Sequence, residues 1–186
     1  MRKEILLLGV VGLVSLQSGC ATSPGSDLLV PKGNEDKMVI RDTQFEEMAG
    51  NSSKYQGRTV LLAGAIVSID ETNEGYQVLA EWLPYPKRQS EEGPKAIQSD
   101  EHRHFLIRFV GKRDREFYTI RGNKFLLEGT VEGTKQGLGN LFGPKQDLLY
   151  INAKCVHIWE TGEANIGSSQ GDSEYPPARE RTLCAD

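Results

Sequence analysis

The strongest constraint on the fold is a two-residue alternation of apolar side chains that begins at Arg58 and recurs along most of the chain. A period of two is the signature of β-strands, whose successive side chains point to opposite faces. It recurs over residues 76–82, 105–109, 125–133 and 149–155. The first strand is apolar on both faces, which predicts burial on both sides. One face has Leu61, Ala63, Ala65, Val67 and Ile69, and the other has Val60, Leu62, Gly64 and Ile66.

The alternation predicts a mainly β fold, and glycines inside the strands favour tight bends or close backbone approach. We therefore expect a small antiparallel OB-like barrel of five to six strands with one short helix, and a β-sandwich is the alternative. The helix is expected to begin at Thr43, with Glu46 completing a capping box, and to end at Gly50. Residues 135–147 are glycine-rich and are expected to form a loop.

The N-terminus has the pattern of a secretory signal peptide, with Arg2-Lys3 before the apolar run Ile5–Val14. That run is too short to span a bilayer. Gly19-Cys20 follows it and resembles the lipobox of bacterial lipoproteins, in which the cysteine receives diacylglycerol and becomes the new N-terminus. The expected organisation is a signal peptide (1–19), a lipidated tether (20–40), a β-barrel domain (41–160) and a polar, disordered tail (161–186).

Charge and motifs exclude several function classes. Without Arg2, Lys3 and Glu4, the chain keeps 20 basic and 25 acidic residues, a net charge of −5, which argues against nucleic acid as a partner. The glycine-rich stretch 133–143 lacks the Gly-Lys-Ser/Thr ending of a phosphate loop, and no other cofactor motif is present, so no cofactor is expected.

The three cysteines are Cys20, Cys155 and Cys184, an odd number that needs an explanation in a secreted protein. Lipidation of Cys20 supplies one and leaves Cys155 and Cys184 as a candidate disulfide pair in an oxidising compartment. The alternative is a buried Cys155 and a free thiol at Cys184.

Two groups of side chains are candidates for chemistry. Asp100, His102 and His104 follow a charged loop, so a solvated strand entry without metal is expected. The alternative is a periplasmic metal-dependent enzyme, because His-x-His on a strand directs both imidazoles to one side and Asp100 or His157 could supply a third ligand. Trp82 and Tyr85 could form an aromatic ligand face, as in OB modules that bind glycans or oligonucleotides; the alternative is that Trp82 belongs to the core.

The sequence also resembles a known family. The resemblance covers roughly residues 40–160 and the signal peptide, and its elements are Tyr55-Gln56-Gly57-Arg58, Gly64, Trp82-Leu83-Pro84, Gly129-Thr130-Val131-Glu132-Gly133 and His157-Ile158-Trp159. Together with the lipobox they resemble the Slp family of outer-membrane lipoproteins, named for starvation-inducible expression. The resemblance implies a non-enzymatic lipoprotein in envelope maintenance or stress, with an envelope protein or glycan as partner. Ala21, in place of the Asp that favours inner-membrane retention, implies the periplasmic face of the outer membrane.

Overall fold

The computed structural model describes residues 38–73, 75–87, 93–95, 102–109, 121–138, 144–162 and 179–185. The signal peptide, Cys20 and Asp100 lie outside the described residues. The described elements are β1 (Met38–Val39), α1 (Asp42–Gly50), a 3₁₀ turn η2 (Ser52–Lys54), β2 (Thr59–Thr72), β3 (Gly75–Leu83), β4 (His104–Phe109), β5 (Lys124–Leu138), β6 (Lys145–Trp159) and β7 (Glu180–Cys184).

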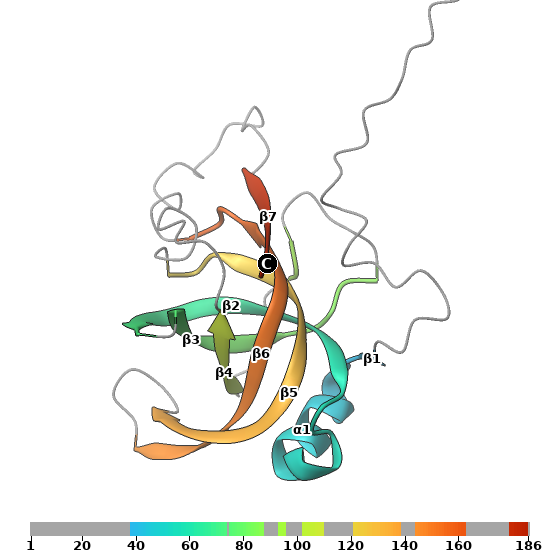
Figure 1. The fold of residues 1–186 in the computed structure, drawn as a ribbon. Helices are drawn as coiled ribbons and strands as arrows, with labels where there is room; N and C mark the ends of the chain where they lie inside the picture. Colours follow the sequence, from blue (N-terminus) through green and yellow to red (C-terminus); the bar gives the residue numbers. More distant parts are fainter. Residues whose placement is uncertain are drawn as a thin grey trace, which may run out of the picture.

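The described part of the chain is mainly β, with seven strands in one mixed sheet and one short α-helix, arranged as in Figure 1. Five of the strands close a ring of hydrogen bonds in the order β2-β3-β4-β6-β5 and back to β2. The long strand β2 makes this closure possible, because it pairs with β5 along its first half and with β3 along most of its length. The β-sandwich alternative would need two sheets, whereas the described strands form one.

The expectation of a purely antiparallel sheet is wrong. β4 pairs with β6 in parallel, through Leu106↔Tyr150 to Phe109↔Ala153, and β1 pairs in parallel with the start of β2. Each sequence pattern shows that a strand is present, but it contains no information on which neighbour the strand meets. The parallel contact arises because the long β5–β6 hairpin returns its second strand to β4.

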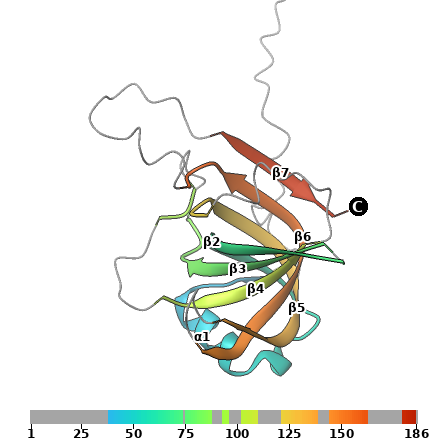
Figure 2. The ribbon, with the colours of Figure 1, turned by 90° about the vertical axis from the view of Figure 1, so that its left-hand side faces the viewer.

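The expected loop at 135–147 is also corrected. β5 runs to Leu138 and β6 begins at Lys145, and the two pair in register as far as Leu138↔Lys145. The glycines in this stretch weaken a strand signal without preventing a strand when the partner is adjacent. The β5–β6 hairpin is therefore much longer than the sequence suggested, and Figure 2 shows its two strands running together.

Both ends of the expected domain also differ from the sequence-based boundaries. Met38 and Val39, expected in the tether, pair with Val60 and Leu61 in the sheet. Glu180–Cys184, expected in a disordered tail, forms β7 and pairs with the last part of β6. Both segments are short, and β7 is also largely polar, so their pairing depends on partners that lie far away in the sequence.

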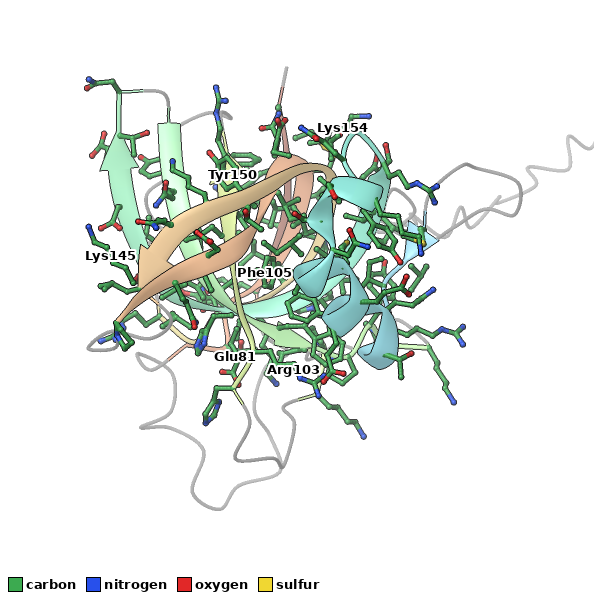
Figure 3. The ribbon with its side chains drawn as sticks, turned by 90° about the horizontal axis from the view of Figure 1, so that it is seen from below. Glu81, Arg103, Phe105, Lys145, Tyr150 and Lys154 are labelled. Atoms are coloured by element: carbon green, nitrogen blue, oxygen red, sulfur yellow. A yellow bond between two sulfur atoms is a disulfide. The ribbon has the colours of Figure 1, made fainter. Side chains whose placement is uncertain are left out.

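The main core fills the ring, and α1 closes one end of it (Figure 3). Phe45 of α1 stacks on Trp82 with ring centroids 5.3 Å apart and meets the edge of Phe105 at 5.9 Å. Met48, one turn further along the helix, is also fully buried. The apolar face of α1, formed by Phe45 and Met48, therefore covers the open end of the ring. Its first residue is Asp42, and the backbone N–H of Arg41 donates to Gln44 Oε1 at 3.1 Å, so the cap lies two residues before the expected Thr43.

Two smaller apolar clusters lie on the outer face of the ring. One consists of Ala63, Leu83, Leu126 and Trp159, and the other of Leu79, Leu106 and Leu148. They explain why β2 is apolar on both faces, since its outer face is covered as well as its inner one. Residues 93–95 help to cover the first cluster, because a side chain at Gly93 would lie 2.8 Å from the Trp159 ring.

Gly64 gives a direct test of the ring closure. It pairs with Trp82 on one side and Phe125 on the other, and an added Cβ would lie 2.6 Å from the Glu81 carbonyl oxygen and 2.7 Å from Phe125 Cζ. We expect Gly64→Ala to lower the free energy of unfolding by about 1–3 kcal/mol, measured by urea denaturation.

Gly50→Ala is the matched control. Gly50 ends α1, and an added Cβ there would have nothing within 4 Å. This variant should be neutral or stabilising by up to about 1 kcal/mol because alanine is the better helix former. Equal stability of the two variants would contradict the close approach at Gly64.

Candidate functional site

Trp82 does not contribute to an exposed aromatic face. It is 0% exposed and belongs to the core inside the ring. The alternation along β3 directs Tyr76, Val78, Ala80 and Trp82 inward, and α1 then covers the indole. The expectation of a Trp82–Tyr85 ligand face is therefore wrong for Trp82, and the alternative reading, that Trp82 belongs to the core, describes its position.

Tyr85 lies on the other side of the sheet from Trp82. It packs partly buried against the outer cluster of Ala63, Leu83, Leu126 and Trp159. Burial raises the pKa of the Tyr85 phenol to about 12, and the nearby Glu128 carboxylate adds to the effect. The phenol is thus a neutral group within a covered patch, and it is separated from Trp82 by the sheet.

The candidate metal ligands are only partly brought together. The rings of His102 and His104 lie 6.5 Å apart, and His102 Nδ1 lies 2.7 Å from Glu81 Oε1. His157 is far along β6, where its Nδ1 lies 2.7 Å from Thr182 Oγ1 and its Nε2 3.3 Å from Glu180 Oε2. Within the described ranges, no group of three His, Cys, Asp or Glu side chains is arranged to hold a metal ion.

The side chains around His102 and His104 line a groove of about 340 Å³ at the end of the ring that α1 covers. We call it the α1 groove. Three segments form it: one face of α1, the start of β4 and the start of β6. Its lining residues are Phe45, Glu46, Ala49, His102, Arg103, His104, Gln146, Asp147, Leu148 and Leu149.

Arg103 organises the rim of the α1 groove. Its Nη2 lies 2.8 Å from Glu46 Oε1 of α1, and its guanidinium lies 5.5 Å from the ring centre of Trp82. Figure 3 shows Arg103 and Glu81 at the edge of the ring. There the backbone N–H of Trp82 donates to the backbone carbonyl of Arg103 at 2.7 Å. Arg103 therefore joins the helix to the sheet by charge, by cation–π contact and by its backbone.

The chemistry of the α1 groove suits binding. Phe45, Ala49 and Leu149 supply an apolar floor, while Arg103 and Asp147 supply donors and acceptors at the rim. Among the described lining residues, none is a serine, threonine or cysteine that could act as a nucleophile. This groove has no direct signal in the sequence, because its three segments are brought together only by the position of α1 across the ring end.

The outer face of β3 and β4, which OB modules use for ligands, is covered by the chain itself. Leu79, Leu106 and Leu148 bury one another there, and a Cβ at Gly137 would lie 2.9 Å from Leu106 Cδ1. The Lys135 ammonium also donates to Gln77 Oε1 at 2.6 Å. The long β5–β6 hairpin thus occupies the face that a ligand-binding OB module would leave open.

Two histidines make the stability of the domain depend on pH. Burial lowers the pKa of His104, with Glu81 opposing the shift, and burial likewise lowers the pKa of His157, with Glu180 opposing it. Below the ordinary histidine pKa of about 6.5, the unfolded chain therefore binds more protons than the folded one, so stability falls with acidification.

We expect the free energy of unfolding to decrease between about pH 7.5 and about pH 5. The double variant His104→Gln/His157→Gln should flatten that part of the profile, as measured by urea denaturation at each pH. A wild-type curve that rises on acidification would contradict the assignment, and so would an unchanged slope in the double variant.

Comparison with known proteins identifies the family. The model of the outer membrane lipoprotein Slp family matches residues 18–182, which include the Gly19-Cys20 pair, all the elements from β1 to β6 and the first three residues of β7. No curated protein and no solved structure matches the chain. Among the described helices, none has both the length and the apolar character needed to cross a membrane. The family is not known as one of enzymes. The chain belongs to the Slp family of outer membrane lipoproteins.

Proposed function

We propose that this protein is anchored by lipid on Cys20 to the periplasmic face of the outer membrane and acts there without catalysis. The family match carries the proposal, because it begins at residue 18 and so includes the cysteine of the lipobox. Burying acyl chains contributes about 0.8 kcal/mol per CH₂, and more than one chain gives stable attachment. In this view, residues 1–19 are removed and the residues after Cys20 connect the lipid to the domain.

The folded domain is an OB-like barrel in this proposal. The order of the five ring strands supports it, since the first strand pairs with both the second and the fourth and the third pairs with the fifth. The interior is filled by aromatic and aliphatic side chains, including Phe105, Phe109 and Phe125. Because the interior is filled, a partner must bind to the surface of the domain.

The contact surface is the α1 groove, and the partner is an envelope protein or glycan that serves envelope maintenance or the response to starvation. An apolar floor with a charged rim resembles the composition of protein interfaces and of sites that bind polar ligands. The β5–β6 hairpin covers the competing face on β3 and β4. The α1 groove, by contrast, combines apolar and polar groups in an open concavity.

The anchor is tested by replacing the lipidated cysteine. Cys20→Ala should move the protein from the outer-membrane fraction to the soluble periplasmic fraction, with an intact mass lacking acyl groups and a far-ultraviolet circular dichroism spectrum typical of a folded β domain. Ala21→Asp is the matched control, since it should keep the lipid and shift the protein to the inner membrane. Tight membrane association of Cys20→Ala would overturn the anchor.

The α1 groove is tested by photocrosslinking in intact cells. A photoreactive residue at position 46, on the groove, should give a discrete adduct with an envelope protein or glycan. The control position is 71, because Glu71 is exposed on the β2–β3 hairpin and does not line the groove. Adducts of the same kind and yield at both positions, or none at position 46, would rule out the groove as the contact surface.

A further inference from the structure

β7 is an added strand that completes one side of the domain. β6 pairs with β4 only as far as Ala153, and from Cys155 to Trp159 the same edge of β6 pairs with β7. Figure 1 places β7 at the end of the ring away from α1. Beyond the strand bounds, Ala185 N–H donates to the Lys154 carbonyl at 2.7 Å and Glu160 N–H to the Arg179 carbonyl at 2.8 Å.

β7 covers part of the core. Its Leu183 packs against the main cluster beside Val156 of β6, to which it is directly opposed. Ile158, opposite Arg181, is fully buried. The backbone pattern shows that residues 154, 156, 158 and 160 direct their N–H and C=O groups toward β7, since these alternate along an antiparallel strand. Removing β7 would uncover apolar side chains and an unpaired strand edge together.

The Cys155–Cys184 disulfide joins β7 to β6. Cys184 is exposed, whereas Cys155 is half-buried. Polar side chains also link β7 and its flank to β6: Thr182 and Glu180 meet His157, and the exposed Arg179 pairs with Glu160. Exposed ion pairs contribute little, so the covalent bond is the strongest link between the two strands.

We propose that the Cys155–Cys184 disulfide is a thiol–disulfide exchange site that determines whether β7 remains on the core. The reaction partner is a dithiol reductant. Its thiolate attacks the exposed Cys184 Sγ, the Cys155–Cys184 bond breaks, and Cys155 leaves as a thiolate that takes a proton from water. The second thiol of the reductant then attacks the mixed disulfide, which releases Cys184 and leaves the reductant oxidised to its own disulfide.

The reduced domain keeps its five-strand ring, because all the ring pairings lie outside β7. Loss of the cross-link raises the chain entropy of the segment that carries β7, so the equilibrium for its release shifts by about 100-fold. Release exposes the β6 edge and Val156, which produces a surface that exists only in the reduced protein.

The test is hydrogen exchange by NMR on the full mature chain, oxidised and then reduced with dithiothreitol. The amides of Val156 and Ile158 should exchange about 100-fold faster after reduction, and reoxidation should restore their protection. The amides of Leu62 and Leu127, in the ring, should change little. Unchanged protection at Val156 and Ile158 would overturn the proposal, and an equal increase at all four positions would show that the disulfide only adds global stability.

Two variants complete the experiment. Cys155→Ser/Cys184→Ser should show the reduced pattern without dithiothreitol, and Thr182→Val, which keeps the disulfide, should show the oxidised one. Attack at Cys184 is tested with reduced glutathione and the oxidised wild-type chain, in which the mixed disulfide should form on Cys184, as located by mass spectrometry of peptides from the quenched reaction. A mixed disulfide found first on Cys155 would overturn the assignment of Cys184 as the attacked sulfur.

Discussion

The structure depends on the double pairing of β2. This strand closes the ring because it has one neighbour on each edge, and both neighbours place large aromatic side chains beside Gly64. Trp82 and Phe125 fill the interior at the level of Gly64, where an added Cβ would lie 2.6 Å from the Glu81 carbonyl oxygen and 2.7 Å from Phe125 Cζ. The small size of Gly64 therefore makes room for the two large side chains beside it. The position of α1 follows from it, because Phe45 stacks on the Trp82 that Gly64 accommodates.

The two ends of the ring are closed by different means. At one end, α1 is held by aromatic stacking and by the ion pair between Glu46 and Arg103, and the groove beside it combines apolar and charged groups. At the other end, β7 is held by backbone pairing and by a covalent bond. The α1 end can thus bind a partner without a change in the fold. The β7 end, in contrast, responds to redox conditions through its disulfide.

Sequence reasoning succeeded where a single strand carries its own signal. The alternation from Val60 onward marks β2, and the similar pattern at Phe105–Phe109 marks β4, because burial on one face is encoded locally. It failed where the outcome depends on a distant partner. Leu183 and Met38 have no local pattern and join the sheet through β6 and β2. Trp82 lies in an alternating strand, so which face is inside depended on the closure of the ring. The α1 groove could not be predicted for the same reason. Its histidines, His102 and His104, were considered as metal ligands, but within the described ranges they belong to no group of three side chains that could hold a metal ion.

Ring closure has a consequence for a protein that is confined to a surface. Anchored copies move in two dimensions at high local density, where unpaired strand edges invite one molecule to add to the next. Of the strands in the described sheet, those outside the ring are β1, with two residues, and β7, with five residues that include Glu180 and Arg181. Short and charged edges offer poor templates for such addition, so the architecture favours copies that remain separate at high density on a membrane.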